Sequence, residues 1–160
     1  MNLSMQSQKW LDTNLYPFEN KYIQLKTGKM HYVDEGEGDI ILFVHGTPTW
    51  SFLYRDYITS LSKKYRCIAI DHLGFGLSDK PENFDGTPSS HSRNLSEFIL
   101  KLNLQNITLV VHDFGGPIGL SAAIQNSSSV ISVWEKDTLV GLVRTIADQE
   151  TICYIQDILI

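Results

Sequence analysis

Residues 107–120 read ITLVVHDFGGPIGL, and this stretch decides the fold. A run of branched apolar residues ends at His112 and Asp113, two glycines follow, and small apolar residues then resume. The pattern predicts a buried strand, a sharp turn and a helix, with one acidic side chain at the apex. An aspartate lifted clear of a sheet by such a turn can attack carbon and become an alkyl ester. Asp113 is therefore a candidate nucleophile, although the position also suits an N-cap of the following helix.

Strand-like runs alternate with helical patterns on both sides of this stretch. We expect strands at residues 22–25, 30–33, 40–44, 67–70 and 107–111, the first two forming a hairpin. We expect helices over 50–61, from a cap at Ser89 or Ser90 to about 102, and over 115–125. Because parallel strands need crossover connections of helix length, this order predicts an α/β fold with a largely parallel sheet.

The chain divides into three parts on these patterns. Residues 1–20 form an N-terminal extension, residues 21–125 form the core, and residues 126–160 form a divergent tail. The tail is rich in apolar residues but holds no single period for long, and 130–134 is its one segment suited to a further strand.

Composition and charge exclude several classes of function. The 160 residues are 42% hydrophobic, which suits one globular domain, and 13 basic against 18 acidic residues give a net charge of −5. The charges are scattered, so we expect no nucleic-acid partner. No apolar run approaches membrane-spanning length and the N-terminus lacks the apolar segment of a secretory signal, so we expect no membrane association and a cytoplasmic location. Cys67 and Cys153 match no metal-binding spacing and are expected to be free buried thiols.

Polar or glycine-containing sequences follow three of the expected strands. They are HGTP at 45–48, DHLGFGLS at 71–78 and HDFGG at 112–116. Turn residues end many strands for structural reasons alone. Ligands of open α/β sheets nevertheless bind outside the carboxyl ends of the strands, so three such sequences together favour one functional site.

These motifs, in this order, resemble the α/β-hydrolase superfamily, in particular its haloalkane dehalogenase and epoxide hydrolase branch. HGTP is similar to the HGxP motif of the branch, DHLGFGLS to the loop after the next strand, and HDFGG to the nucleophile elbow with an aspartate. The resemblance covers roughly residues 21–125. It implies the N-terminal part of an α/β-hydrolase fold, a mostly parallel sheet with flanking helices and no cap domain.

The resemblance also implies roles for particular residues. Asp113 would be the nucleophile, and the backbone N–H groups of Thr47 and Phe114 would form the oxyanion hole. The substrate would be a small molecule with a carbon–halide, ether or epoxide bond, and neither a cofactor nor a metal is implied. The supporting positions would be His45, Gly46, Pro48, His112, Gly115 and Gly116, with Pro48 restraining Thr47 and the glycines letting the helix approach the strand.

Two features depart from the pattern of the branch. Its dehalogenases commonly hold the leaving halide with a tryptophan after the nucleophile and an asparagine after His-Gly, where this chain has Phe114 and Thr47. Phenylalanine has no donor, so halide stabilisation would need donors from elsewhere. The branch also uses a late histidine to activate water, whereas all five histidines here precede Asp113. We therefore expect a chain truncated or changed in frame after about Gln125, and incapable of full turnover alone.

Two other hypotheses remain open at this point. One is a non-catalytic binding or interaction module that retains the hydrolase core and self-associates through an exposed sheet edge near 107–111, unless the tail covers it. The other is a metal site, since histidine and carboxylate suit zinc or iron, although no His-x-His pair supports it. Its ligands would come from His45, Asp71, His72, His112 and Asp113. The remaining histidines, His31 and His91, are expected at the surface or at a helix cap.

Overall fold

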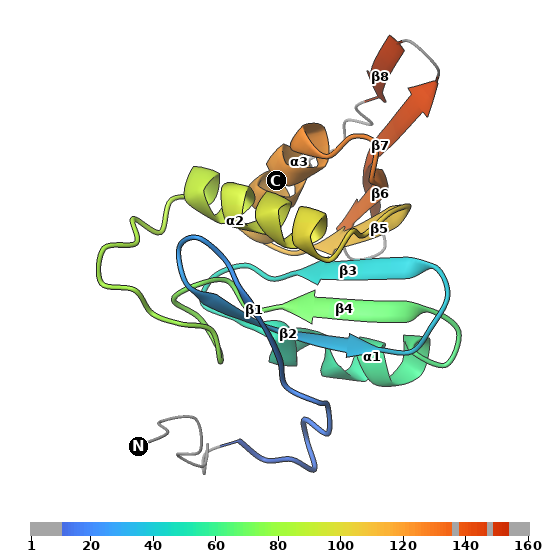
Figure 1. The fold of residues 1–160 in the computed structure, drawn as a ribbon. Coiled ribbons are helices and arrows are strands. Elements are labelled where there is room, and N and C mark those ends of the chain that lie inside the picture. The colour runs from blue at the N-terminus through green and yellow to red at the C-terminus, as the bar shows by residue number, and fades with distance from the viewer. Residues whose placement is uncertain (1–10, 136–137, 147–148, 154–160) are drawn as a thin grey trace.

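The computed structural model describes residues 11–135, 138–146 and 149–153. In this part of the chain, eight strands form a sheet in the order β1-β2-β4-β3-β5-β6-β7-β8, with helices packed on it (Figure 1). The strands are β1 (Lys21–Gln24), β2 (Lys29–Glu35), β3 (Ile40–Val44), β4 (Arg66–Ile70), β5 (Ile107–Val111), β6 (Val130–Glu135), β7 (Thr138–Ile146) and β8 (Gln149–Cys153). The helices are the short 3₁₀ helix η2 (Ser51–Tyr54), α1 (Arg55–Leu61), α2 (Pro88–Lys101) and α3 (Gly115–Gln125).

The centre of the sheet is parallel. β3 pairs in parallel with β4 on one side and with β5 on the other, and β5 pairs in parallel with β6. The flanking pairs, β1 with β2, β2 with β4, β6 with β7 and β7 with β8, are antiparallel. The predicted α/β fold is confirmed, and the parallel strands bring the ends of β3, β4 and β5 to one edge of the sheet.

The tail contributes to this sheet. The segment predicted at 130–134 is confirmed as β6, which aligns with β5 from Ile107 to Val111. Since β5 therefore has neighbours on both sides, it is not the exposed edge considered from the sequence. Residues 1–10 of the predicted extension and 154–160 of the predicted tail lie outside the described residues.

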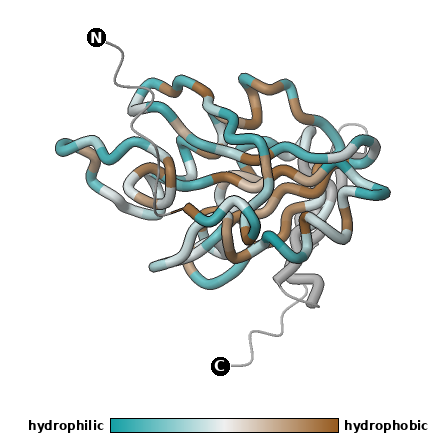
Figure 2. Tube along the Cα trace, turned by 90° about the horizontal axis from the view of Figure 1, so that it is seen from below, coloured by the Kyte–Doolittle hydropathy of each residue, from teal (hydrophilic) through white to brown (hydrophobic). Residues whose placement is uncertain are grey.

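Alternate residues of the strands pack into two apolar layers. Leu42 and Val44 of β3 pack in the layer that contains α2 and α3, whereas Phe43 between them packs in the layer that contains α1. Figure 1 shows α2 and α3 on one side of the sheet and α1 on the other. Hydrophobic residues gather mainly along the strands in the middle of the molecule (Figure 2). Burying each large apolar side chain contributes about 1.5–3 kcal/mol, so these two layers hold the strand ends in place.

The helices differ in two details from the prediction. The N-cap of α2 is Thr87, whose Oγ1 accepts a hydrogen bond from Ser90 N at 3.2 Å, and not Ser89 or Ser90. Pro88 then occupies the first turn, where its missing N–H costs nothing. The helix predicted over 50–61 is divided between η2 and α1. No helix in the described residues is long and apolar enough to cross a membrane.

Cys67 is a free, buried thiol, as predicted, and burial raises its pKa to about 11. A thiol with so high a pKa stays protonated and is a poor nucleophile. The side chain of Cys153 lies outside the described residues.

Candidate active site

The turn between β5 and α3 presents Asp113 at its apex. Asp113 has a φ of 54°, a left-handed conformation that aspartate tolerates better than most residues. The N-cap of α3 is Phe114, so Asp113 stands before the helix instead of capping it. The side chain is solvent-exposed. The strand, turn and helix predicted from residues 107–120 are therefore present.

Close packing around this turn depends on glycine at two positions. A Cβ on Gly46 would lie 2.5 Å from Asp113 Cβ, and a Cβ on Gly115 would lie 2.2 Å from the carbonyl oxygen of Val44. Gly116 does not share this role, because no atom lies within 4 Å of the place where its Cβ would be. Close approach was expected at Gly116, but it is found instead at Gly119, which was not expected and whose Cβ would meet Val111 Cγ1 at 2.7 Å.

The carboxylate of Asp113 is held through one oxygen. Oδ1 accepts hydrogen bonds from Thr47 N at 3.1 Å and from Phe114 N at 2.6 Å. Among the described residues, no hydrogen bond reaches Oδ2. The bonds from Phe114 and then Thr47 lower the pKa of Asp113, so the group is ionised at neutral pH. The two backbone donors expected to form an oxyanion hole thus converge on the expected nucleophile.

Hydrogen bonds to the loop after β4 hold the chain just before Thr47. The Thr47–Pro48 peptide bond is cis. His72 N donates to His45 Nε2 at 2.9 Å, and His72 Nε2 donates to the carbonyl oxygen of His45 at 3.1 Å. The sequences after β3, β4 and β5 therefore meet, as expected from the parallel sheet.

A cavity of about 280 Å³ lies beside the turn on the α1 side of the sheet. His112 lines it, and the ring Nδ1 of His112 is buried with no hydrogen-bond partner among the described residues. The other lining residues are Phe43, Leu53, Tyr54, Tyr57, Val110 and Val111. A larger cavity, of about 510 Å³, lies over α2 and away from Asp113. Neither cavity is lined by the carboxylate itself.

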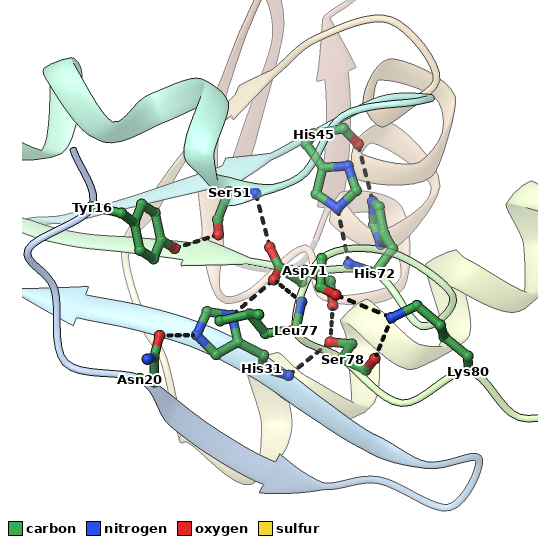
Figure 3. Close-up of polar contacts among 11 residues, drawn as sticks. Tyr16, Asn20, His31, His45, Ser51, Asp71, His72, Leu77, Ser78 and Lys80 are labelled. Atoms are coloured by element: carbon green, nitrogen blue, oxygen red, sulfur yellow. Dashed lines mark hydrogen bonds and ion pairs between the residues drawn. The ribbon is translucent and has the colours of Figure 1, made fainter. Parts of the chain in front are cut away.

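A second aspartate, Asp71, organises the loops behind the turn (Figure 3). Its Oδ1 accepts from Ser51 N at 2.8 Å, and its Oδ2 accepts from His31 Nδ1 at 2.9 Å and from Leu77 N at 2.8 Å. Burial alone would raise the pKa of this carboxyl, but the hydrogen bonds, led by that from His31, lower it overall. Gly76, at a φ of 47°, leaves room for the carboxylate, because a Cβ there would lie 2.1 Å from Oδ2.

Two histidines expected at the surface or at a cap are buried instead. His31 is fully buried, with Nδ1 facing Asp71 and Nε2 facing Asn20 Oδ1 at 2.9 Å. His91 is 5% exposed and packs against the rings of His72 and Phe84. The prediction of exposed or capping histidines was wrong because the residues that bury them come from other parts of the sequence. Neither histidine lies in a local sequence pattern that indicates burial.

The described residues contain no group of three histidine, cysteine or carboxylate side chains placed to hold a metal ion. Asp71, one of the residues considered for such a site, is occupied by hydrogen bonds from His31, Ser51 and Leu77. The metal hypothesis gains no support from this arrangement.

Three features of this chain define an α/β hydrolase. They are a mixed sheet with a parallel centre, a tight strand-to-helix turn that bears a carboxylate, and two backbone N–H donors that point at this carboxylate. The profile of the alpha/beta hydrolase fold family matches residues 39–138, and the chain belongs to this family. Within it, the similar proteins place the chain in the haloalkane dehalogenase and epoxide hydrolase branch.

Relatives of several activities support this placement. The chain is 44% identical over 135 residues to haloalkane dehalogenase 2 of Mycobacterium tuberculosis, covering 80% of this chain and 47% of the relative. It is also 44% identical over 116 residues to a cis-3-alkyl-4-alkyloxetan-2-one decarboxylase of Shewanella oneidensis, covering 71% and 36%. A solved epoxide hydrolase of Bacillus megaterium superposes with a TM-score of 0.66 at 30% identity, covering 72% of this chain and 41% of that one. These relatives support a hydrolase type of function, and the chain spans about half their length or less.

Proposed function

We propose that Asp113 is the nucleophile of a hydrolase of the haloalkane dehalogenase and epoxide hydrolase type, which attacks an electrophilic carbon of a small molecule. The observation that carries this proposal is the asymmetry of its carboxylate. Oδ1 is held by Thr47 N and Phe114 N, while Oδ2 has no hydrogen bond from the described residues and the side chain is exposed. A carboxylate fixed through one oxygen presents the other to a substrate in a defined direction.

The proposed first step is a displacement at carbon. Oδ2 of Asp113 forms a bond to the carbon, and the bond to the leaving group breaks with its electron pair. The product is an alkyl ester whose carbonyl oxygen is Oδ1, already within reach of both backbone donors. If water later attacks this ester, negative charge develops on Oδ1, and each donor of such a pair speeds the step by about 100- to 1,000-fold.

The leaving group must be a halide or the oxygen of a strained ring. Relatives at equal identity carry the names of a dehalogenase and of an oxetanone decarboxylase, so identity alone does not choose between them. Phe114 supplies no side-chain donor and Thr47 supplies one hydroxyl, which limits the stabilisation of a departing halide by these two side chains. The proposal therefore covers carbon–halide and strained carbon–oxygen bonds.

We further propose that this 160-residue chain forms the ester and does not release it by itself. Release needs a base that activates water, and no histidine follows Asp113 in the sequence. Of the five histidines, His31 is bound to Asp71, while His45 and His72 bind each other's loops. A single alkylation per chain is the expected behaviour.

Alkylation is tested by incubating the protein with 1-bromobutane or with 1,2-epoxybutane and weighing the intact chain. We expect one adduct per molecule, and none in the Asp113→Asn variant. A matched control is Asp85→Asn, because Asp85 is also exposed and its Oδ1 also accepts a backbone hydrogen bond, from Thr87 N at 3.0 Å. This control should label like the unmodified protein. Sustained release of bromide or diol would contradict the single-turnover proposal.

A non-catalytic binding module is the second candidate. The observation in its favour is the cavity beside α1, where apolar side chains such as Val110 line a hollow and Tyr57 remains 59% exposed. An absence of adduct with both reagents, in a protein that is folded, would favour this candidate. Self-association through a sheet edge, the partner expected from the sequence, is tested in the same sample by light scattering.

A further inference from the structure

Three buried histidine rings pack one against the next, with 55–56° between the planes of neighbouring rings, and are called the histidine stack below. They are His45 at the end of β3, His72 after β4 and His91 in α2. The ring centroids of His45 and His72 are 4.5 Å apart, and those of His72 and His91 are 4.8 Å apart. None of the three is more than 5% exposed. The proposed reaction uses none of these rings directly, so their role requires a separate explanation.

Hydrogen bonds define the proton positions on two of the rings. His45 Nδ1 lies 2.8 Å from the carbonyl oxygen of Gly46, which only accepts, so Nδ1 carries the proton. His45 Nε2 accepts from His72 N and is therefore bare. His72 Nε2 donates to the carbonyl oxygen of His45 (Figure 3). His45 is thus neutral in this arrangement, whereas His72 carries a proton on Nε2 and its Nδ1 has no hydrogen-bond partner among the described residues.

The bond from His45 acts on the peptide unit that supplies the oxyanion donor. The Gly46 carbonyl and the Thr47 N–H belong to one planar peptide group and point in opposite directions when it is trans. The carbonyl is held by His45 Nδ1 and by Thr49, through N at 3.2 Å and Oγ1 at 3.0 Å. Fixing the carbonyl therefore fixes the direction of the N–H, which reaches Asp113 Oδ1.

We propose that His45 is a positioning residue, whose neutral ring aims the Thr47 N–H at Asp113 and does so only while the histidine stack is uncharged. A second proton on His45 would sit on Nε2, where it would face the His72 N–H, and two donors cannot bond each other. The ring would have to turn away, and its bond to the Gly46 carbonyl would be lost with it. Only the two bonds from Thr49 would then hold the carbonyl, and the alignment of the oxyanion donor would weaken.

The surroundings of the stack favour the neutral form. Burial is the main cause that lowers the pKa of His45, His72 and His91. Neighbouring rings lower the pKa of His72 and of His91 further, whereas the hydrogen bond to the Gly46 carbonyl raises that of His45. The charged groups that oppose this are Asp71, which faces His45, and Asp85, which faces His91. The uncharged rings of Phe75 and Phe84 pack against His45 and His91. Protonation is therefore expected below the ordinary histidine pKa of 6.5.

The inference depends on the proposed role of Thr47 in the oxyanion hole, but its test needs no reaction. Nitrogen-15 NMR follows the ring nitrogens of the three histidines and the hydrogen exchange of the Thr47 amide as the pH falls from neutral. We expect neutral rings at pH 7, with the Nδ1–H form of His45. Protection of the Thr47 amide should be lost as the rings of the stack gain protons. The Phe114 amide is an internal control and should keep its protection, because its bond to Asp113 does not pass through the stack.

Two variants separate positioning from general stability. His45→Gln carries an amide oxygen that can accept from His72 N but does not ionise, so protection of the Thr47 amide should persist to lower pH. His45→Leu removes both ring bonds and should speed exchange at Thr47 by about tenfold at every pH, with Phe114 unchanged. Simultaneous loss of protection at all amides, or Thr47 protection that ignores ring protonation, would overturn the inference. A failed alkylation with the expected amide profile would instead reject the proposed function and leave the positioning intact.

Discussion

Asp71 follows β4 and Asp113 follows β5, and these two strands lie on either side of β3. Each carboxylate accepts two backbone N–H groups, Asp71 from Ser51 and Leu77, and Asp113 from Thr47 and Phe114. Asp71 is fully buried and uses both oxygens, one of them also for His31. Asp113 is exposed and uses one oxygen. The same residue type at the same edge of the sheet thus has two different environments.

The difference separates a structural carboxylate from the one that we propose as the nucleophile. Burying a charge is costly unless it is paired and hydrogen-bonded, and a buried carboxylate with bonds on both oxygens presents no accessible, unbonded oxygen to a substrate. A carboxylate in water with one oxygen fixed keeps its charge, its direction and its access. Both aspartates lie at the same edge of the sheet. The number of carboxylate oxygens that accept hydrogen bonds therefore indicates which of the two can act as a nucleophile.

The largest effect is expected for Asp71→Asn. The amide keeps the size of the side chain but leaves His31 without its carboxylate partner and cannot accept through both branches. Each buried donor left without an acceptor costs about 1–3 kcal/mol, so we expect a loss of at least this size in the free energy of unfolding. Urea denaturation followed by tryptophan fluorescence measures it. A loss below about 1 kcal/mol would remove the distinction between the two aspartates.

Acid is expected to have the next largest effect. A histidine whose pKa is lowered by folding contributes stability that is complete above its unfolded pKa of 6.5 and is lost as the pH falls below that value. Between pH 6.5 and 5.5 we expect the free energy of unfolding to fall by about 1 kcal/mol for His72, whose pKa lies well below its ordinary value, and to fall further through His45 and His91.

Denaturation at a series of pH values checks this, with His72→Gln as the matched variant. Glutamine retains a donor that can reach the carbonyl oxygen of His45 but cannot take up a proton. The variant should therefore lose about 1 kcal/mol less than the unmodified protein over the same interval. Stability that rises on acidification, or an unchanged slope in the variant, would contradict the neutral stack.

The smallest effect on stability is expected for Asp113→Asn. Asparagine tolerates the left-handed conformation at this position, and the side chain is exposed. We expect the free energy of unfolding to change by a small fraction of the loss expected for Asp71→Asn, in the same denaturation experiment. A loss as large as that of Asp71→Asn would make Asp113 a structural residue.

The segment 107–120 was sufficient for predicting the fold because its information is local. A strand, a turn and a helix are encoded in consecutive residues, and the motifs at 45–48 and 71–78 mark the ends of two further parallel strands. Parallel pairing then brings these ends together without further assumptions. The convergence of Thr47 and Phe114 on Asp113 was expected from the family resemblance.

The supporting contacts could not be predicted because they join distant parts of the chain. His31 and Asp71 are 40 residues apart, and His45 and His72 are 27 apart. A histidine carries no local sign of burial, so His31 and His91 were expected at the surface or at a helix cap. The glycine at position 76 was a possible sequence signal, since it occupies a left-handed turn close to Asp71. It indicates a buried carboxylate only when the direction of the Asp71 side chain is known.

The most direct test of the account is to map the alkylated residue by tandem mass spectrometry after incubation with 1-bromobutane. We expect a single butyl ester on Asp113, with Asp71 unmodified because both of its oxygens are bonded and buried. Asp85, exposed and hydrogen-bonded but outside the elbow, should also remain unmodified. Label spread over exposed carboxylates such as Asp85, or label placed elsewhere with Asp113 intact, would contradict the assignment of Asp113 as the nucleophile.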